Sequence, residues 1–290
     1  MSVLQALRLF HQRRIALPIV EDALVLDVGS GDKPSWRADV LLDRYLGTEF
    51  AVQRSGRGRA RISRPLFNAD AAAMPFADGA FDYTICSNLL EHVVDPAGVI
   101  RELLRVSRAG YIEVPEASSA KIVDFPSHLW WCRLDESTSP PTLVLTAKEA
   151  PAFDPEIAEY LRRSGLERRV EAVLNSRFEH RVVMLHWSKT INYRVEGEVP
   201  ASLVDSAMAA PGHTKDLPAA VISAATDLLT YRKQRRLGKR ALRYDDVVRP
   251  EFRRGDDAPL ERRIYSDPRW TPDASTAAGA DQHRSDQYGS

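Results

Sequence analysis

Glycines and acids come together in one stretch near the start of the chain. The sequence ALVLDVGSGDKP, residues 23–34, ends an apolar run at Asp27 and then places Gly29 and Gly31 around a single serine. A second apolar run follows at once and ends in Asp43. Such turns suit nucleotide-like ligands, because glycines let the backbone approach the ligand and an acid on the next strand accepts hydrogen bonds from ribose hydroxyls. The pattern predicts a site for a nucleotide-like cofactor at this turn.

The spacing of this stretch argues against a dinucleotide. A dinucleotide fingerprint has a third glycine and opens a full helix, whose N-terminus holds the pyrophosphate. Here Pro34 takes the place of that glycine, and few residues separate Gly31 from the next apolar run at Asp39. A carboxylate at Asp27 is costly to bury unless a cation or a hydrogen-bond donor meets it. These features favour a ligand with an ammonium group and ribose hydroxyls but no phosphate, such as S-adenosylmethionine.

The surrounding elements predict a sheet that would position these residues. Short apolar runs alternate with helical stretches, which is the pattern of a parallel α/β sheet. Asp95 as N-cap and Pro96 in the first turn predict the start of a helix. Two further strands around a proline-rich turn are expected in residues 128–149, and helical structure in 154–174. The other strands are predicted at 23–28, 39–44, 66–70, 81–86 and 111–115, with a closing antiparallel pair in 177–198.

Three stretches together carry a family resemblance. LDVGSGDKP (26–34) resembles the first motif of class I S-adenosylmethionine-dependent methyltransferases, and LLDRY (41–45) is similar to the acid-bearing end of their second strand. NADAAAMPFADGAFDYTICSNLLEHVVDPAGVIRELLRV (68–106) resembles the rest of their core, in the variant typical of the small-molecule, type 11-like branch. The resemblance implies a Rossmann-like α/β fold: a mostly parallel sheet with an antiparallel last strand, an inserted hairpin and a C-terminal extension. The missing third glycine and the shortened first helix depart from the family pattern.

The resemblance also assigns roles to individual residues. Taken alone, acids at strand ends, such as Asp43, are commonly ordinary turn residues, and only the ordered set favours a binding role. The cofactor is expected to be S-adenosyl-L-methionine. Its methionine part would lie on the turn of Asp27, Gly29, Ser30 and Gly31, its ribose on Asp43, its adenine on Asp70 and Ala71, and its sulfonium beside Ser87 and Asn88.

Two histidines are candidates for the chemistry of transfer. Methyl transfer depends largely on alignment, but a hydroxyl acceptor also needs a base to take its proton. His92, in LEHV, and His128, in FPSHLWW, are expected on the substrate side, and an unperturbed imidazole titrates near pH 6.5. His92 is equally compatible with a structural hydrogen bond, and Trp130 and Trp131 with simple packing of the hairpin. The sequence shows no cluster with metal-ligand spacing, so no metal is predicted.

Composition excludes several classes of function. Lys and Arg total 40 and balance 40 Asp and Glu, so global charge indicates neither nucleic acid nor an anionic membrane. Two cysteines form no disulfide framework. The first residues lack the apolar core of a signal peptide, and no run approaches the ~18 apolar residues of a membrane helix. A cytoplasmic protein without stable membrane insertion is expected; the oligomeric state is left open.

The expected activity is methylation of a small-molecule or glycan acceptor, with a hydroxyl favoured over nitrogen or carbon. A catalytically inert, methyltransferase-like regulatory subunit is the alternative. Nucleic acid is disfavoured as a partner, because no recognisable RNA-binding module accompanies the basic segments. The arginine-rich residues 51–64 predict either a solvated loop or a lid over an anionic ligand. The predicted domains are a methyltransferase domain (1–200), a helical basic extension (201–249) and a disordered tail (250–290) with too few apolar residues for a core.

Overall fold

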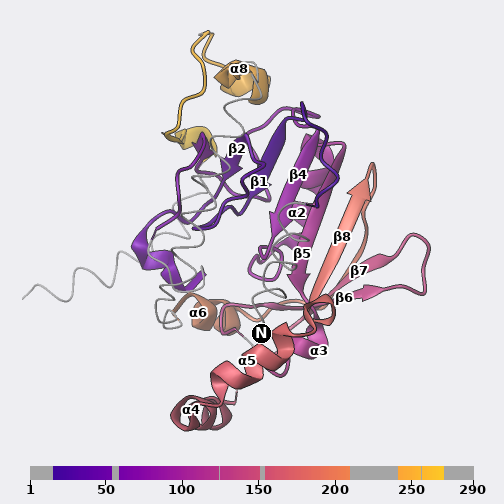
Figure 1. Ribbon diagram of the computed structural model, residues 1–290. Coiled ribbons are helices and arrows are strands. Elements are labelled where there is room, and N and C mark those ends of the chain that lie inside the picture. The colour runs from indigo at the N-terminus through magenta and orange to yellow at the C-terminus, as the bar shows by residue number, and fades with distance from the viewer. Residues whose placement is uncertain are drawn as a thin grey trace, which may run out of the picture.

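A mostly parallel central sheet organises the protein (Figure 1). The computed structural model describes residues 16–53, 59–123, 125–150, 154–209, 241–255 and 257–270. Among these, seven strands lie in the order β10-β3-β2-β1-β4-β5-β8, and only β8 is antiparallel to its neighbour. The predicted α/β class with an antiparallel last strand is confirmed. The strands are β1 (Val25–Val28), β2 (Val40–Leu42), β3 (Leu66–Phe67), β4 (Tyr83–Ser87), β5 (Ala109–Pro115), β8 (Val182–Ser188) and β10 (Ile264–Tyr265).

Both faces of this sheet are covered, which explains why its strands read as continuous apolar runs. Leu26 and Val28 of β1 belong to the main hydrophobic cluster, whereas Val25 points into a second cluster on the opposite face. The same alternation separates Cys86 from Ile85 on β4. Because side chains of a strand alternate between faces, one short run contributes to both cores.

The predicted helix after β4 is confirmed as α2 (Pro96–Val106). Its N-cap is Asp95, whose side chain accepts a 2.7 Å hydrogen bond from the Gly98 N–H, and Val99 and Leu103 lie on its buried face. The remaining described helices are α3 (Ala117–Ala120), α4 (Pro155–Ser164), α5 (Glu167–Asn175), α6 (Ala201–Ala209), α8 (Tyr244–Val247) and the 3₁₀ turns η2 (Thr48–Gln53), η3 (Phe178–His180), η4 (Pro250–Phe252) and η5 (Pro268–Trp270). Of the helices described, none has the length and apolar character to cross a membrane.

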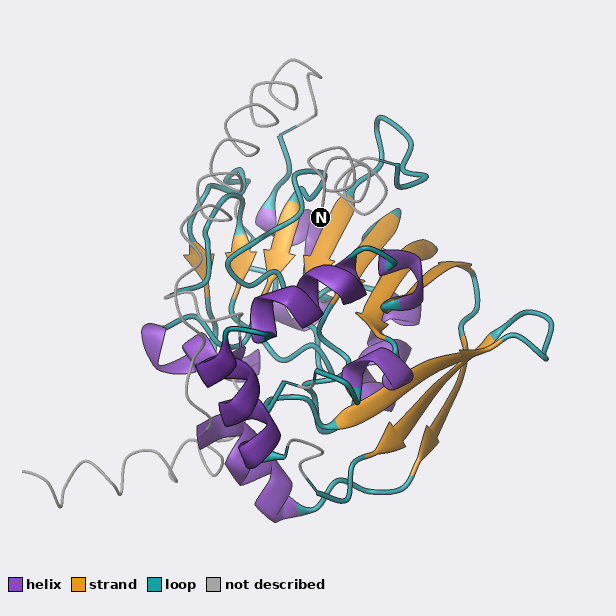
Figure 2. Ribbon diagram, turned by 60° about the horizontal axis from the view of Figure 1, so that its bottom comes forward, coloured by secondary structure: helices purple, strands orange, loops and turns teal. Residues whose placement is uncertain are grey.

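The inserted hairpin forms, but the predicted closing pair of strands does not. β6 (Trp130–Asp135) and β7 (Thr142–Ala147) pair antiparallel, as predicted (Figure 2). β8 and β9 (Asn192–Glu196) were expected to pair with each other, yet β8 pairs with all seven residues of β5 and β9 joins β7 in a second, three-stranded sheet. β8 thus completes the central sheet, and the partly buried Tyr193 and Val195 of β9 pack against the main hydrophobic cluster.

The predicted disorder from residue 250 is wrong for residues 250–255 and 257–270. β10 pairs in parallel with β3 and so extends the central sheet at its edge. Tyr265 and Trp270 are buried, and their rings lie 5.2 and 5.9 Å from the ring of Phe67. A few aromatic side chains fix this polar segment, because each buries a large apolar area. Of the predicted helical basic extension (201–249), the structure describes α6 at its start and residues 241–249 at its end; residues 210–240 and 271–290 lie outside the described residues.

Candidate functional site

The glycine turn after β1 has the backbone that its sequence predicts. Gly29 has a φ of +71° and Gly31 a φ of +53°, a conformation that residues with a Cβ rarely adopt. A Cβ on Gly29 would also lie 2.9 Å from the side chain of Leu89. The hydroxyl of Ser30 between them is buried and makes no hydrogen bond with the described residues. The turn therefore combines a backbone that favours glycine with a buried hydroxyl that lacks a partner among the described residues.

Asp27 is held by the short connection between β1 and β2. Its carboxylate is buried and accepts a 2.6 Å hydrogen bond from the backbone N–H of Ser35. No helix forms between Gly31 and β2, as the sequence predicts. The donor that this buried acid requires is therefore supplied, at least in part, by the protein itself.

Asp43 follows β2 and ties that strand to the glycine turn. Its side chain is 7% exposed, and its two oxygens accept hydrogen bonds from the N–H of Gly31 at 2.7 Å and of Tyr45 at 2.9 Å. These two hydrogen bonds fix the orientation of the carboxylate at the end of β2.

Asp70 lies at the more open edge of the same region. Its carboxylate forms a 2.7 Å ion pair with Arg44 and accepts a 2.8 Å hydrogen bond from the N–H of Ala72, whereas the neighbouring Ala71 is buried in the core. The sequence did not predict Arg44 as a partner. The arginine-rich segment also approaches this region, because the N–H of Arg61 donates a 2.8 Å hydrogen bond to the Gly31 carbonyl.

Ser87 and Asn88 end β4, where the chain turns sharply. Asn88 has a φ of +52°, which asparagine tolerates better than most residues. Its N–H donates to the carbonyl of Glu113 at 2.7 Å, and its side-chain amide lies 3.3 Å from the Glu113 carboxylate. That carboxylate also accepts a 2.7 Å hydrogen bond from the hydroxyl of Tyr111. Glu113 thus sets the orientation of Asn88, a supporting role that the sequence did not reveal.

His92 and His128, although 36 positions apart, lie side by side. Their ring centroids are 4.8 Å apart in an edge-to-face arrangement, and the backbone N–H of Leu129 donates a 2.7 Å hydrogen bond to the Glu91 carbonyl. Glu91 brings its carboxylate to the same point, with one oxygen 3.9 Å from His92 Nε2. Ligand-type atoms of all three residues lie within 4.8 Å of one another. The sequence missed this cluster because its third member comes from a distant segment.

Residues 26–112 match a family described as a methyltransferase domain. The chain contains a class I S-adenosylmethionine-dependent methyltransferase domain. An uncharacterized methyltransferase from Mycobacterium sp. (strain KMS) is 37% identical over 94 residues, which cover 31% of this chain and 36% of that protein. A demethylmenaquinone methyltransferase from Roseiflexus sp. (strain RS-1) is 36% identical over 102 residues, which cover 33% and 42%.

The similarity to these proteins is confined to the methyltransferase domain. The matched segment spans well under half the length of each of these two relatives. A solved S-adenosylmethionine-dependent methyltransferase from Methanosarcina mazei aligns with 45% of this chain and 72% of its own at 18% identity, with a TM-score of 0.27. The predicted family is confirmed for residues 26–112 by the family match and by the methyltransferase-named relatives.

Burial shifts the pKa values of Glu91 and His92, two of the three residues of this cluster. Burial raises the pKa of Glu91 to about 8; the backbone N–H of Glu91 and the charge of Lys148 oppose the rise, and Glu113 adds to it. Burial and the neighbouring His128 lower the pKa of His92 to about 3, although its bond to Ser127 opposes the change. His92 is therefore neutral at pH 7, and its pKa lies far below the value near 6.5 expected from sequence.

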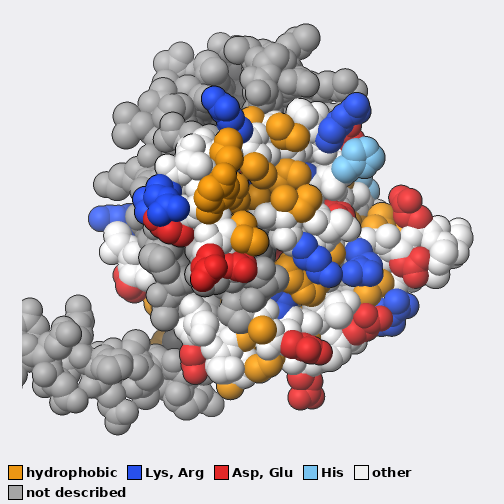
Figure 3. Space-filling view, turned by 90° about the horizontal axis from the view of Figure 1, so that it is seen from below, with side chains coloured by type: hydrophobic (Ala, Val, Ile, Leu, Met, Phe, Trp, Pro, Cys, Tyr) orange, Lys and Arg blue, Asp and Glu red, His pale blue; other side chains and the backbone are white. Residues whose placement is uncertain are grey.

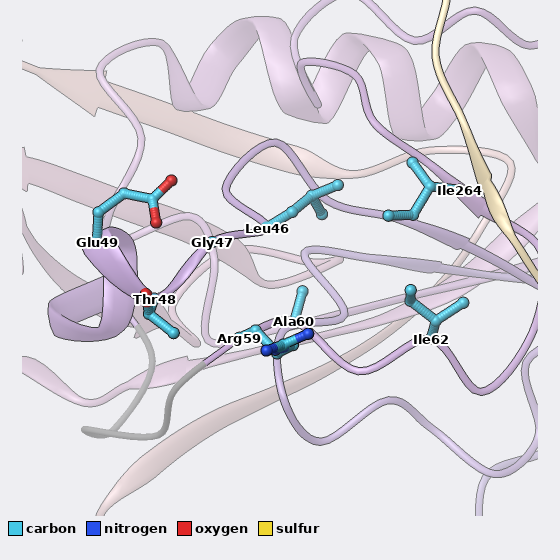
Figure 4. Close-up of a pocket in the computed structure, with 8 residues that line it drawn as sticks. All are labelled: Leu46, Gly47, Thr48, Glu49, Arg59, Ala60, Ile62 and Ile264. Carbon is cyan, nitrogen blue, oxygen red and sulfur yellow. The ribbon is translucent and has the colours of Figure 1, made fainter.

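The described part of the protein has two cavities, and none of the residues predicted to bind the cofactor or to act in catalysis lines either one. The first, of about 330 Å³, lies beyond β2 between residues 46–49 and 59–62, with Ile264 of β10 at its edge (Figure 4). Glu49 and Arg59 bring opposite charges to its walls. The second, of about 320 Å³, lies between the start of α2 and the three-stranded sheet. Seen from below, where the parallel strands end, the surface carries apolar, acidic and basic side chains next to one another (Figure 3).

Proposed function

We propose that the protein transfers a methyl group from S-adenosylmethionine to a small-molecule or glycan acceptor, with a hydroxyl as the favoured acceptor group. The observation that carries this proposal is the fixed carboxylate of Asp43. It lies at the end of β2 in a domain of the methyltransferase family and is bonded to the glycine turn through Gly31. An acid fixed there suits a ligand that carries a ribose.

The residues at the ends of β1, β2 and β4 fit this cofactor. Gly29 and Gly31 have positive φ angles and no side chains to obstruct a ligand, and the buried Ser30 hydroxyl is available for a polar group of the methionine part. The cofactor supplies an activated methyl group when bound. The chain's own residues orient it and exclude water. The roles that we propose are methionine binding by Asp27, Gly29, Ser30 and Gly31, ribose binding by Asp43, adenine binding by Asp70 and Ala71, and lining of the methyl side by Ser87 and Asn88.

The histidine pair supports a hydroxyl acceptor. Such an acceptor needs a group that takes its proton as the new bond forms. His92 is a weak base because burial lowers its pKa to about 3, so His128 is the better candidate of the two. Transfer to nitrogen or carbon is the first alternative, and the name of the Roseiflexus relative gives a demethylmenaquinone as one such acceptor class. A catalytically inert regulatory protein is the second.

Calorimetry and radiolabelled transfer test the proposal together. We expect S-adenosylmethionine to bind the wild-type protein and Asp43→Ala to weaken that binding. Asp82→Ala is the matched control, because Asp82 also bonds a backbone N–H, that of Leu24 at 2.8 Å, but precedes β4 at the other end of the sheet. Transfer of labelled methyl to an acceptor from a panel of hydroxyl, amine and quinol compounds identifies the acceptor group. Absence of cofactor binding by the wild-type protein contradicts the proposal.

A further inference from the structure

The cluster of Glu91, His92 and His128 has a composition that methyl transfer alone does not explain. Each residue offers one atom of the kind that binds metal ions, and these atoms lie within 4.8 Å of one another. Glu91 and His92 follow β4, whereas His128 precedes β6 in the inserted segment. Two separate parts of the fold therefore converge on one buried point.

The hydrogen bond of His92 determines which of its nitrogens faces Glu91. Nδ1 lies 3.0 Å from the carbonyl oxygen of Ser127, and because a carbonyl can only accept, Nδ1 must carry the hydrogen. In the neutral ring the lone pair then sits on Nε2, which is 3.9 Å from a carboxylate oxygen of Glu91. This distance is too long for a hydrogen bond. Two electron-rich atoms thus face each other across a gap that suits a positive ion.

Glu91 needs such an ion more than any acid of the cofactor region. Its side chain is 0% exposed, and neither carboxylate oxygen has a hydrogen-bond partner among the described residues. The nearby positive charge of Lys148 lies 4.0 Å over the ring of Trp131 and does not bond these oxygens. An isolated carboxylate in an apolar interior is costly, and a coordinated cation removes that cost.

We propose that Glu91, His92 and His128 bind a divalent transition-metal cation. One carboxylate and two imidazoles form a ligand set used for zinc and for iron(II), whereas calcium and magnesium prefer oxygen ligands alone. Zinc–ligand bonds of about 2.0–2.2 Å place tetrahedral ligands roughly 3.4 Å apart, so the side chains need to close by about 1 Å. The bond from His92 Nδ1 to Ser127 is the kind of contact that orients a metal-binding histidine.

Three protein ligands leave at least one coordination position open. An acceptor hydroxyl bound there would become more acidic, which would replace the need for a histidine base. This consequence rests on the proposed function, whereas metal binding itself does not. A histidine that binds the cation through its lone pair is not available as a proton acceptor at the same time.

Metal titration of the whole chain tests the inference without any methyl acceptor. Protein stripped by a chelator is titrated with zinc by calorimetry and with cobalt(II) by visible absorption. We expect one zinc ion per chain in the wild type and at least about tenfold weaker binding in Glu91→Gln and in His128→Gln, since even the loss of a supporting contact costs about 10–100-fold. His180→Gln is the matched control, because this exposed histidine lies in η3, outside the cluster.

The titration results distinguish a metal site from its absence. Failure of the wild-type protein to bind zinc, or unchanged binding in both cluster variants, overturns the inference. If the variants do not fold, the wild-type cobalt spectrum decides: intense bands of a four- or five-coordinate ion support the site, and the weak spectrum of the hydrated ion rejects it. Protein that binds S-adenosylmethionine but no metal refutes this inference alone, whereas metal binding without cofactor binding refutes only the proposed function.

Discussion

Two buried acids lie on either side of β1, and the protein treats them differently. Asp43 follows β2, and each of its carboxylate oxygens accepts one backbone hydrogen bond. Glu91 follows β4, and neither of its oxygens has a partner among the described residues. The backbone therefore stabilises the charge of Asp43. The charge of Glu91 receives no such hydrogen bond, and a proton or a cation would neutralise it.

The neighbours of each acid explain the difference. Asp43 meets the N–H groups of a glycine turn and of its own following turn, which are directed at it by the backbone. Glu91 instead faces imidazoles and lies near two buried thiols, Cys86 and Cys132, whose pKa values are raised mainly by burial and further by Glu91 itself. Thiols are weak donors, so the surroundings of Glu91 stabilise its charge poorly.

The largest expected change in stability comes from Trp270, which is far from both acids in the sequence. It is the reference against which the effects of substituting the acids can be judged. Trp270→Ala removes a buried ring that packs against Phe67, Tyr244 and Phe252. We expect a loss of about 3–5 kcal/mol in the free energy of unfolding, typical of a large-to-small change in a core. Urea denaturation measures it, with Trp270→Phe as the milder control. A loss below about 1 kcal/mol, the range of ordinary surface changes, would show that the segment is not part of the core.

The next largest effect is expected on the Glu91 side. In metal-free protein, His128→Ala should lower turnover by about 10²–10⁴-fold, the usual contribution of a positioned base, and should leave the affinity for S-adenosylmethionine unchanged. Steady-state methyl transfer and calorimetry measure the two quantities. His180→Ala should keep the wild-type rate. Near-normal turnover in His128→Ala would remove this histidine from the chemistry and favour an acceptor that needs no base.

A smaller effect is expected on the Asp43 side, and on binding. Asp43→Ala should weaken S-adenosylmethionine binding by about 2–3 kcal/mol. The substitution would remove two proposed hydrogen bonds from ribose hydroxyls; each bond to a charged group is worth ~1.5–3 kcal/mol, and the two contributions are not additive. Calorimetry measures the change, with Asp82→Ala as control. Unchanged affinity in Asp43→Ala would exclude the acid from the cofactor site. Asp70→Ala should show a smaller loss, since Arg44 already occupies one of its oxygens.

The smallest expected effects are those of replacing Asp43 and Glu91 by their amides. These two substitutions compare directly how well the protein stabilises each acid. Asp43→Asn replaces one carboxylate oxygen by an NH₂ group, which then faces a backbone N–H that it cannot accept from. The substitution should cost about 1–2 kcal/mol in the free energy of unfolding. Glu91→Gln in metal-free protein should cost nothing or stabilise by up to about 1 kcal/mol, because the neutral amide avoids the cost of ionising a buried acid and offers a donor to His92 Nε2. Urea midpoints of both variants give the two values. Equal losses in both would mean that Glu91 is as well satisfied as Asp43.

Local patterns were enough to predict part of the fold and of the site. The apolar run at β1, the glycine turn and the cap formed by Asp95 and Pro96 all act within a few residues, and each forms as predicted. The acids Asp27 and Asp43 could be named because strand ends and turns place them. The sequence could not show that Ser35, Gly31 and Tyr45 supply the donors.

Contacts between distant segments decided the rest. The alternation in β8 and β9 predicts strands but not their partners, because the strands that they pair with come from distant parts of the chain. Trp270 joins the core because Phe67 provides a ring against which it packs. By itself the sequence determined the glycine turn, the acids and the family. Only the tertiary structure could bring His128 to Glu91 and leave that carboxylate without a donor, since its surroundings come from chain segments far apart.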